Sequence, residues 1–423
     1  MSAVPRTTEI AVIGAGAIGA SVALQLALAG REVLLLDRGE VGRGASAGTA
    51  CLLTASHAER LANPHALLEG LRFLADPEGP LAIRPQPRLL PWLTRFAAAA
   101  VRSRAAHAGS ALLQRAAVES LALHREWNER HETGMVEAGL LNVWASEAGG
   151  EQARRWAREH RAAGIEVQLL DADEIRELEP LVRGARHGSL YPGDAHVDSL
   201  GFTEAVARAA QRAGARLATG VDTIRIVPGP TGVRLDTTSG AIHASQVVIA
   251  TGVWSERLAR DAGVELPMCA AKGYHVEYQA TATPGRPVYL GETRVVATPL
   301  EGRIRLAGTL EFGSDPDAVD YRRIDAIQRF GAERLSGIDG ATPTSVWRGP
   351  RPVTADGMPM VGRSPAHENV IIAAGHAMLG ITLAPVTAAW VERLARGEDL
   401  DAALEPLAPG RFRRVTLRRR RRG

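Results

Sequence analysis

The pattern of apolar and polar residues near the start of the chain is typical of two strands with a helix between them. Residues 10–13 form an apolar run, a glycine-rich turn follows, and small residues such as Ala20 and Ala23 continue beyond it. A second apolar run at 33–36 ends in Asp37. This order predicts a strand, a tight turn, a helix and a second strand.

Four residues of this unit suit a bound dinucleotide. Gly14 permits the tight turn, Gly16 lets backbone approach a pyrophosphate, and Gly19 lets the helix pack closely on the strand. The start of the helix offers free amide groups and a positive dipole end to phosphates. Asp37 can accept hydrogen bonds from both hydroxyls of an adenosine ribose. An ordinary βαβ unit without a ligand is the alternative.

The hydrophobic pattern of the rest of the chain changes character twice. Prolines punctuate a loop that ends near Pro91, and the alternation within 272–309 is typical of an antiparallel sheet. Periodicity predicts helices at 94–131, 151–163, 199–213 and 317–336 and from Gly380 to Arg396, and strands at 139–145, 165–170, 215–227, 232–236, 245–251, 272–279, 288–290, 294–299, 303–309 and 369–375.

These elements predict an α/β protein in which a discontinuous Rossmann-like domain is joined to an α+β substrate domain with a mostly antiparallel sheet. We expect residues 1–55, 194–260 and 345–410 to form the nucleotide-binding domain. Residues 56–193 and 261–344 are expected to form the substrate, or cap, domain. The 423 residues suffice for two such domains.

The basic character of the chain is confined to its end. Residues 411–423 hold eight arginines and no acids, so the rest of the chain carries a net charge of −5 (+3 less the eight arginines). We expect this tail to be solvated and disordered. A second interpretation is contact with anionic lipid headgroups, and a third is nucleic-acid contact, which the scarcity of interleaved aromatic residues disfavours.

Cysteine content and hydropathy bear on the cellular compartment. Cys51 and Cys269 are too few for a disulfide framework or a metal site, so no metal is expected. The first strand begins within ten residues of the start, and no apolar run is long enough to span a membrane. We expect a cytoplasmic protein that contacts at most the inner face of the membrane.

Apolar strands end in glycine at three distant points of the sequence. Gly14, Gly252 and Gly375 each leave a place where backbone can lie against a flat or charged ligand. An extended FAD that spans the sheet would use all three, so the nucleotide-binding domain is predicted to bind FAD. Either Gly252 or Gly375 alone is better explained as an ordinary loop glycine.

Arg351 lies between two prolines, which restrict the local backbone to an extended path. A guanidinium held on such a segment suits bidentate recognition of a carboxylate. The alternatives are a surface arginine or an ion pair with Asp356.

Motifs over nearly the full length resemble the FAD-dependent D-amino-acid oxidoreductases, which include D-amino-acid dehydrogenase, glycine oxidase and sarcosine oxidase. They comprise the opening fingerprint, the turn at 44–46, residues 194–198 and 248–255, the Arg351-Pro segment and residues 375–380. The stretch from Asp76 to Phe96 is most similar to the dehydrogenases. The resemblance implies that FAD binds non-covalently and that Arg351 anchors the substrate carboxylate. The cofactor-binding residues it implies are Gly14, Gly16, Gly19, Asp37, Arg38, Ser46, Gly252, Gly375 and Gly380.

The chain departs from the family pattern in two places. Residues 48–51 read Gly-Thr-Ala-Cys where dehydrogenases usually carry Asn-Ala-Gly, and Met378 stands where glycine oxidase has a second arginine. Both departures bear on the substrate rather than on the chemistry.

The predicted activity is oxidative deamination of D-amino acids. A hydride leaves Cα for the flavin, the imine hydrolyses to a 2-oxo acid and ammonia, and electrons pass to a quinone or another acceptor other than oxygen. His376 is a candidate catalytic residue beside the flavin, and a helix starting at Gly380 would direct its amides at the reduced ring. His57, His275, Tyr274 and Tyr289 are more simply explained by packing.

Three other activities remain open at this point. The first is an oxidase of glycine, sarcosine or a cyclic secondary amine that produces hydrogen peroxide. The second is a flavin module that modifies tRNA, against which the acidic body argues. The third is a scaffold that keeps FAD for stability alone. The sequence leaves the electron acceptor and the oligomeric state unknown.

Overall fold

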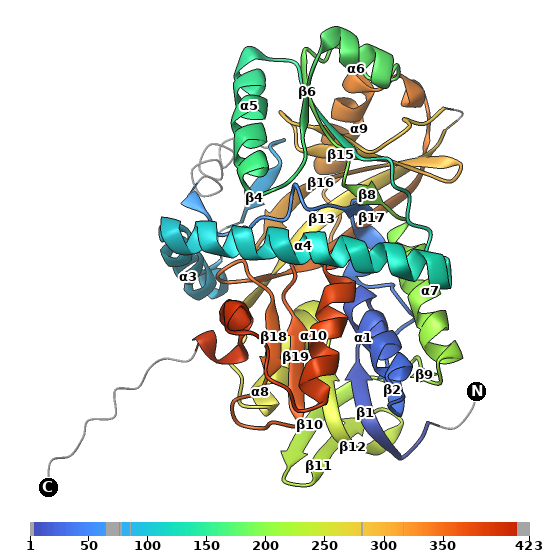
Figure 1. Cartoon of the computed structure of the whole chain (residues 1–423), viewed down its shortest axis with the longest axis vertical. Helices are drawn as coiled ribbons and strands as arrows, with labels where there is room; N and C mark the ends of the chain where they lie inside the picture. The colour runs from blue at the N-terminus through green and yellow to red at the C-terminus, as the bar shows by residue number, and fades with distance from the viewer. Residues whose placement is uncertain are drawn as a thin grey trace, which may run out of the picture.

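The structure is a computed structural model, and it describes residues 4–412 except 65–75, 77, 85, 281 and 316. Two sheets lie one above the other, and the long helix α4 (Ser103–His131) crosses between them (Figure 1). Of the tail predicted at 411–423, Arg411 and Phe412 end a short helical turn, and the rest lies outside the described residues.

The lower sheet has eight strands in the order β10-β11-β12-β1-β2-β9, with β19 paired to β12 and β18 paired to β19. Strands β12, β1, β2, β9 and β19 run parallel. The strands are β1 (Thr7–Ile13), β2 (Val33–Leu36), β9 (Arg216–Ala218), β10 (Thr223–Gly229), β11 (Gly232–Thr237), β12 (Gly240–Ile249), β18 (Met360–Arg363) and β19 (Val370–Ala374).

Helices α1 (Ala17–Leu28), α7 (Ser199–Arg212) and α10 (Ala384–Ala395) cover one face of this sheet, and α8 (Ser255–Asp261) follows β12 (Figure 1). Helix α1 packs against α7, α10 and the sheet, and most of its residues are buried. A helix enclosed on every side has no polar stripe, which explains the run of small and apolar residues found there.

The upper sheet has nine strands in the order β17-β13-β16-β15-β14-β5-β7-β6, with β4 paired to β16. Its pairs are antiparallel except β14 with β5 and β16 with β4. The strands are β4 (Leu81–Ile83), β5 (Leu140–Trp144), β6 (Gln168–Asp171), β7 (His187–Tyr191), β13 (Met268–Gln279), β14 (Val288–Leu290), β15 (Val295–Leu300), β16 (Arg303–Phe312) and β17 (Pro343–Thr354).

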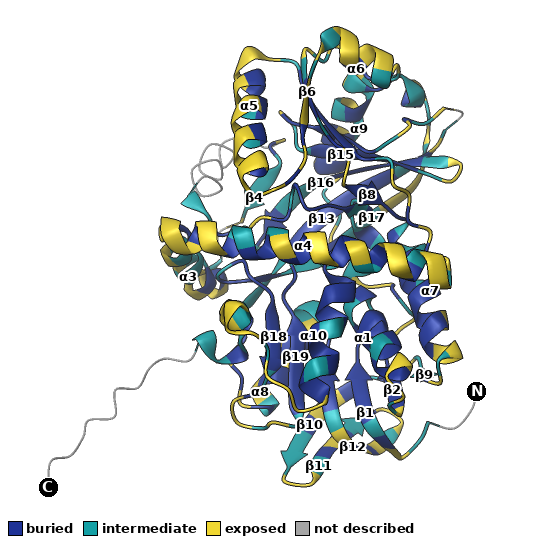
Figure 2. Ribbon diagram, in the orientation of Figure 1, coloured by how far each residue is buried: buried dark blue, intermediate teal, exposed yellow. Residues whose placement is uncertain are grey.

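Helices α3 (Leu90–Ala100), α5 (Glu147–Ala162), α6 (Ala172–Leu178) and α9 (Tyr321–Arg334) accompany this sheet, and β3 (Leu52–Leu53) pairs with β8 (Ala195–His196) between the two parts. Figure 2 shows the central strands buried and the outer stripe of α4 exposed. The predicted fold class is confirmed. Among the described residues, no helix combines the length and the apolar character needed to cross a membrane.

Two predicted helix boundaries are wrong. The helix expected at 94–131 is two helices, because Arg102, with ψ of 74°, leaves the helical region. The helix expected from Gly380 begins at Ala384, with Pro385 in the first turn that suits a residue without an N–H. The domain division stays a prediction; strand β17, most of which falls in the range 345–410, pairs with β13 of the upper sheet along most of its length.

Candidate active site

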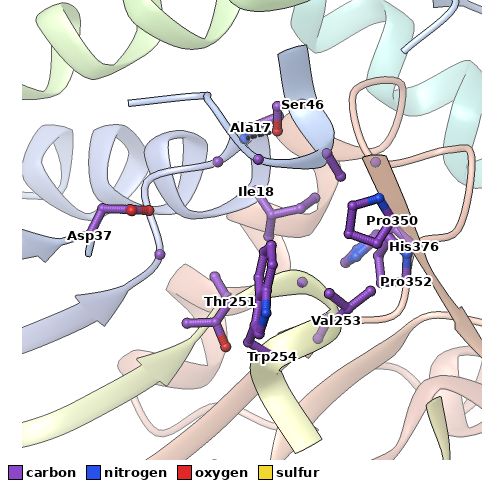
Figure 3. Close-up of a pocket in the computed structure, with 18 of the residues that line it drawn as sticks. Ala17, Ile18, Asp37, Ser46, Thr251, Val253, Trp254, Pro350, Pro352 and His376 are labelled. Atoms are coloured by element: carbon purple, nitrogen blue, oxygen red, sulfur yellow. Dashed lines mark hydrogen bonds between the residues drawn. The ribbon is translucent and has the colours of Figure 1, made fainter. Parts of the chain in front are cut away.

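A cavity of about 750 Å³ runs along the carboxyl ends of the parallel strands and reaches β17. This is the edge at which α/β sheets bind ligands. Figure 3 shows Asp37 on one side of it, Pro350, Pro352 and His376 on the other, and Trp254 between them. Of the predicted site residues, ten line the cavity: Gly14, Gly16, Asp37, Arg38, Ser46, Gly252, Arg351, Gly375, His376 and Gly380.

The turn after β1 has the backbone geometry that the glycine pattern predicted. Gly14 has φ of 102°, and a Cβ there would lie 2.6 Å from the carbonyl oxygen of Ala250. Gly16 precedes α1 without a side-chain cap, and Ser46 Oγ accepts the Ala17 amide at 2.9 Å (Figure 3). The start of α1 therefore faces a glycine-lined space suited to phosphates.

Gly19 does not line the cavity. A Cβ on it would lie 1.7 Å from the carbonyl oxygen of Gly14, so it allows α1 to sit directly against the turn. This agrees with the packing function inferred for the third glycine of the fingerprint.

Asp37 is fixed at the end of β2 by two backbone amides. Its Oδ2 accepts from Ala15 at 2.7 Å and its Oδ1 from Gly39 at 2.8 Å. These bonds leave the remaining lone pairs of both oxygens for a ligand at the cavity side.

Trp254 was not identified from the sequence as a site residue. It lines the cavity, is 44% exposed, and carries the Arg38 guanidinium 4.0 Å above its ring. The stacked pair offers a flat, charged surface of the kind that aromatic ligand rings favour. Its position two residues after Gly252 is the signal that identifies it.

Arg351 lies on β17 at the far end of the cavity. Its Nη1 donates to the carbonyl of Thr309 at 3.0 Å, and its guanidinium occupies the space above Gly273, where a Cβ would lie 1.5 Å from Nη1. Removal from solvent lowers the pKa of Arg351 to about 10, so the group is still charged at neutral pH. No carboxylate forms an ion pair with it within the described part of the chain.

The suggested pair between Arg351 and Asp356 is wrong. Asp356 binds Arg411, whose Nε donates to Oδ2 at 2.8 Å. The Arg351 guanidinium thus remains the one available for an anionic ligand at that end of the cavity, since no other charged residue of β17 or of residues 373–381 lines it.

Strained backbone surrounds this end of the cavity. Thr309 has φ of 63° at the bulge between β13 and β16, and that conformation presents its carbonyl to Arg351. Ala377, which lines the cavity, has φ of 50°, and Cys51 has φ of 61°. Left-handed backbone at residues with a Cβ costs about 1–3 kcal/mol each, and such strain gathers at functional sites.

His376 lies in the loop after β19, and Nε2 is 3.0 Å from Thr387 Oγ1. Burial lowers the pKa of His376 to about 3, so its ring is neutral at physiological pH. The glycine before it is required, because Gly375 has φ of 80° and a Cβ there would lie 2.4 Å from Thr354 Cγ2. Gly252 has φ of 57°, and a Cβ added to it would have no other atom within 4 Å.

The loop after His376 changes the predicted start of the last helix. Gly380 lines the cavity, but it belongs to a turn in which the Leu383 amide donates to Leu379 at 2.8 Å. Helix α10 starts at Ala384, which does not line the cavity, so the predicted start at Gly380 is wrong. That the N-terminus of this helix is directed at the ligand stays a prediction.

The other histidine and tyrosine candidates pack in the protein. Tyr274 is fully buried and donates to Glu311 at 2.7 Å, and Tyr289 is buried 4.8 Å from the ring of His57. His275 stacks on Trp347 at 5.4 Å. None of these residues lines the cavity.

These features fit FAD. A glycine turn, the start of α1 and the carboxylate of Asp37 lie at one end of an extended cavity, and the charged guanidinium of Arg351 lies at the other. Among the described residues, no group of three or more histidine, cysteine or acidic side chains is arranged to hold a metal ion.

Comparison with known proteins gives matches over most of the chain. Residues 9–394 match a family model described as FAD dependent oxidoreductase. A D-amino acid dehydrogenase of Dechloromonas aromatica (strain RCB) is 30% identical over 414 residues, which cover 92% of this chain and 97% of that protein. Glycine oxidase of Geobacillus kaustophilus (strain HTA426) is 30% identical over 415 residues, covering 95% and 96%. The crystal structure of glycine oxidase from Geobacillus kaustophilus aligns with a TM-score of 0.77 at 27% identity, covering 97% and 100%.

Proposed function

Because the chain belongs to the family of FAD-dependent oxidoreductases, we propose that it deaminates D-amino acids oxidatively and passes the electrons to a quinone or another acceptor other than oxygen. The charged guanidinium of Arg351, which has no acidic partner among the described residues, is the observation that carries the proposal. It suits a substrate with a carboxylate beside the reacting carbon.

FAD, when bound, supplies a hydride acceptor. Arg351 binds the substrate carboxylate and thereby fixes the orientation of Cα. The four carboxylates that line the cavity, Asp37, Glu40, Asp222 and Glu256, come from segments other than β17 and the loop at 375–381. Among the residues that the structure describes, the substrate end therefore offers no acidic side chain as a base, and the amine must bind in its neutral form.

Burial lowers the pKa of His376 to about 3, so its ring is unprotonated at neutral pH but is a weak proton acceptor. Its hydrogen bond to Thr387 ties the loop after β19 to α10. A catalytic function for His376 stays a prediction, and the neutral ring favours a function in holding this loop.

Oxidation of glycine, sarcosine or a cyclic secondary amine, with hydrogen peroxide as product, is the second candidate. The similarity to glycine oxidase favours it. Met378, which lines the cavity where that family carries a second arginine, argues against it, since its thioether cannot bind a carboxylate. We also retain as a proposal that the basic residues after Phe412 contact anionic lipids, which would place a membrane quinone within reach.

Anaerobic titration of the holoenzyme with a panel of amines tests the proposal. D-amino acids with a primary amine should bleach the flavin absorbance, whereas glycine, sarcosine and both enantiomers of proline should do so weakly. Bleaching by glycine or sarcosine alone would favour the second candidate, and no bleaching by any amine would contradict both. Stoichiometric peroxide in air, without dye reduction under nitrogen, would contradict the dehydrogenase proposal.

A further inference from the structure

Arg305 on β16 makes a set of contacts that no function above requires. Its side chain is buried in the upper sheet, and Nη1 donates to the carbonyls of Ala47 at 3.1 Å and Thr49 at 3.0 Å. Its Nε and Nη2 both donate to Glu277 Oε1, at 2.9 and 2.7 Å. The charge of the guanidinium is thus balanced within its own sheet, and its free edge is directed at a loop of the nucleotide-binding part.

That loop forms a wall of the cavity. Ser46, Thr49 and Ala50 line it, and Ser46 Oγ accepts the first amide of α1. The loop ends at Cys51, whose φ of 61° is a strained conformation for a residue with a side chain. It is also the stretch in which the sequence departs from the dehydrogenase pattern.

A second residue of the upper sheet holds the same loop. Thr298 on β15 is buried, and its Oγ donates to the Ala50 carbonyl at 2.7 Å. The Cys51 carbonyl accepts the Val197 amide at 2.9 Å, and Cys51 Sγ lies 3.0 Å from Arg305 Nη1. The carbonyls of Ala47, Thr49, Ala50 and Cys51 are therefore all engaged, most of them by the neighbouring sheet.

We propose that Arg305 is a positioning residue for the cofactor: its guanidinium fixes the loop at 46–51, and this loop in turn fixes the start of α1 and the cavity wall against FAD. Charge-assisted hydrogen bonds to two carbonyls select one conformation of a segment whose regular structure is limited to the short 3-10 turn at Ala45–Gly48. The inference rests on FAD occupying this cavity and is independent of which amine the enzyme oxidises.

Arg303 supplies a matched control on the same strand. Its Nε lies 3.3 Å from Glu277 Oε1 and its Nη2 contacts Asp198, so it shares an acidic partner with Arg305. The hydrogen bonds of Arg303 go to Glu277, Asp198 and Glu301, which lie outside residues 46–51, and its side chain is 31% exposed. Removing it takes the same charge from the same network but leaves the loop contacts in place.

The test compares Arg305→Met, Arg305→Lys and Arg303→Met. For each, the FAD dissociation constant is measured by titrating the deflavinated protein, and the visible spectrum of the reconstituted enzyme is recorded beside its thermal melt. Arg305→Met should weaken FAD binding by about tenfold or more, which is the factor expected from the loss of one charge-assisted hydrogen bond. It should also change the shape of the flavin absorption bands. Arg305→Lys should recover part of both, because an ammonium can reach a carbonyl but not bridge to Glu277 as well.

Equal FAD affinity and identical spectra in Arg305→Met and Arg303→Met would overturn the proposal. Should Arg305→Met fail to fold, Thr298→Val removes one loop contact at nearly constant volume. Thr298→Val should weaken FAD binding a few-fold. Unchanged FAD affinity and spectra in both Thr298→Val and Arg305→Lys would also overturn the proposal. These readouts need no amine substrate, so they stand apart from the outcome of the deamination assay.

Discussion

Replacing Arg351 by methionine removes a guanidinium and keeps an unbranched side chain on β17. In the free protein the variant gives up the 3.0 Å hydrogen bond to the Thr309 carbonyl. Once cofactor and substrate fill the cavity, the pair between guanidinium and carboxylate is shielded from water. Loss of one partner of such a pair costs about 2–5 kcal/mol, which corresponds to roughly 30- to 5000-fold weaker substrate binding.

Anaerobic stopped-flow measurement of flavin reduction against substrate concentration gives the apparent dissociation constant. Arg348→Met is the matched control, because Arg348 lies three residues earlier on β17 and therefore on its opposite face, where it pairs with Asp317 at 3.4 Å. It should bind substrate as the wild type does. A third arm measures binding of the corresponding amine without a carboxylate. The wild type should bind the amino acid more tightly than this amine, whereas Arg351→Met should bind the two about equally.

The reasoning fails if Arg351→Met binds the amino acid within a few-fold of the wild type, or if Arg348→Met loses as much. Folding is a separate readout. Because Arg351 has no acidic partner among the described residues, its removal leaves no carboxylate unpaired, and the thermal midpoint without substrate should stay near that of the wild type.

The other predictions concern stability. Four buried histidines fold as neutral rings, because burial lowers the pKa to about 4 or about 3: His124, His196, His275 and His376. Between pH 6.5 and these values the unfolded chain binds more protons than the folded chain. The free energy of unfolding therefore decreases as the pH is lowered, by up to about 1.4 kcal/mol per pH unit for each ring. Thermal melts from pH 7.5 to 5 should show a shallower slope in His376→Asn, and equal slopes would contradict this. Gly19→Ala should lower both the melting temperature and the bound FAD, since its Cβ would lie 1.7 Å from the oxygen of Gly14, and a stable, fully loaded variant would refute it. Arg411→Ala should cost about 2 kcal/mol in urea denaturation, because Asp356 loses a partner at 2.8 Å; an unchanged midpoint would show that the pair contributes nothing.

The nucleotide end of the cavity could be predicted because its determinants are local. Gly14, Gly16, Gly19 and Asp37 lie within one strand–turn–helix–strand unit, so the pattern of periods and glycines defines their geometry without knowledge of the rest of the fold. The start of α10 was placed too early because the chain between Gly380 and Ala384 has helical periodicity but forms a turn.

The substrate end could not be predicted in the same way, because distant strand pairings determine it. Alternation predicts that residues 272–279 form a strand, but it does not identify β17 as the partner or give a register that sets Ala271 opposite Arg351. The bulge that turns the Thr309 carbonyl toward Arg351 has its positive φ at Thr309 and not at the neighbouring Gly308, so no local pattern predicts it. Arg305 gains its contacts only when the two sheets meet, and Trp254 meets Arg38 only when the segments after β12 and β2 come together.

At the substrate end of the cavity, the strand that carries Arg351 is hydrogen-bonded to the loop after β19, and this limits how their separation can vary. Arg351 belongs to strand β17 of the upper sheet. Two residues further along the same strand, Val353 forms an antiparallel bridge with His376 of the loop after β19. The Ala377 amide donates to the Pro352 carbonyl at 3.0 Å in the same place. The residue that would anchor the carboxylate is thus hydrogen-bonded, within two positions, to a loop that lines the cofactor cavity. A reaction without a dedicated base depends on alignment for its rate, and here the alignment depends on backbone hydrogen bonds between two adjacent segments rather than on the packing of one domain against another.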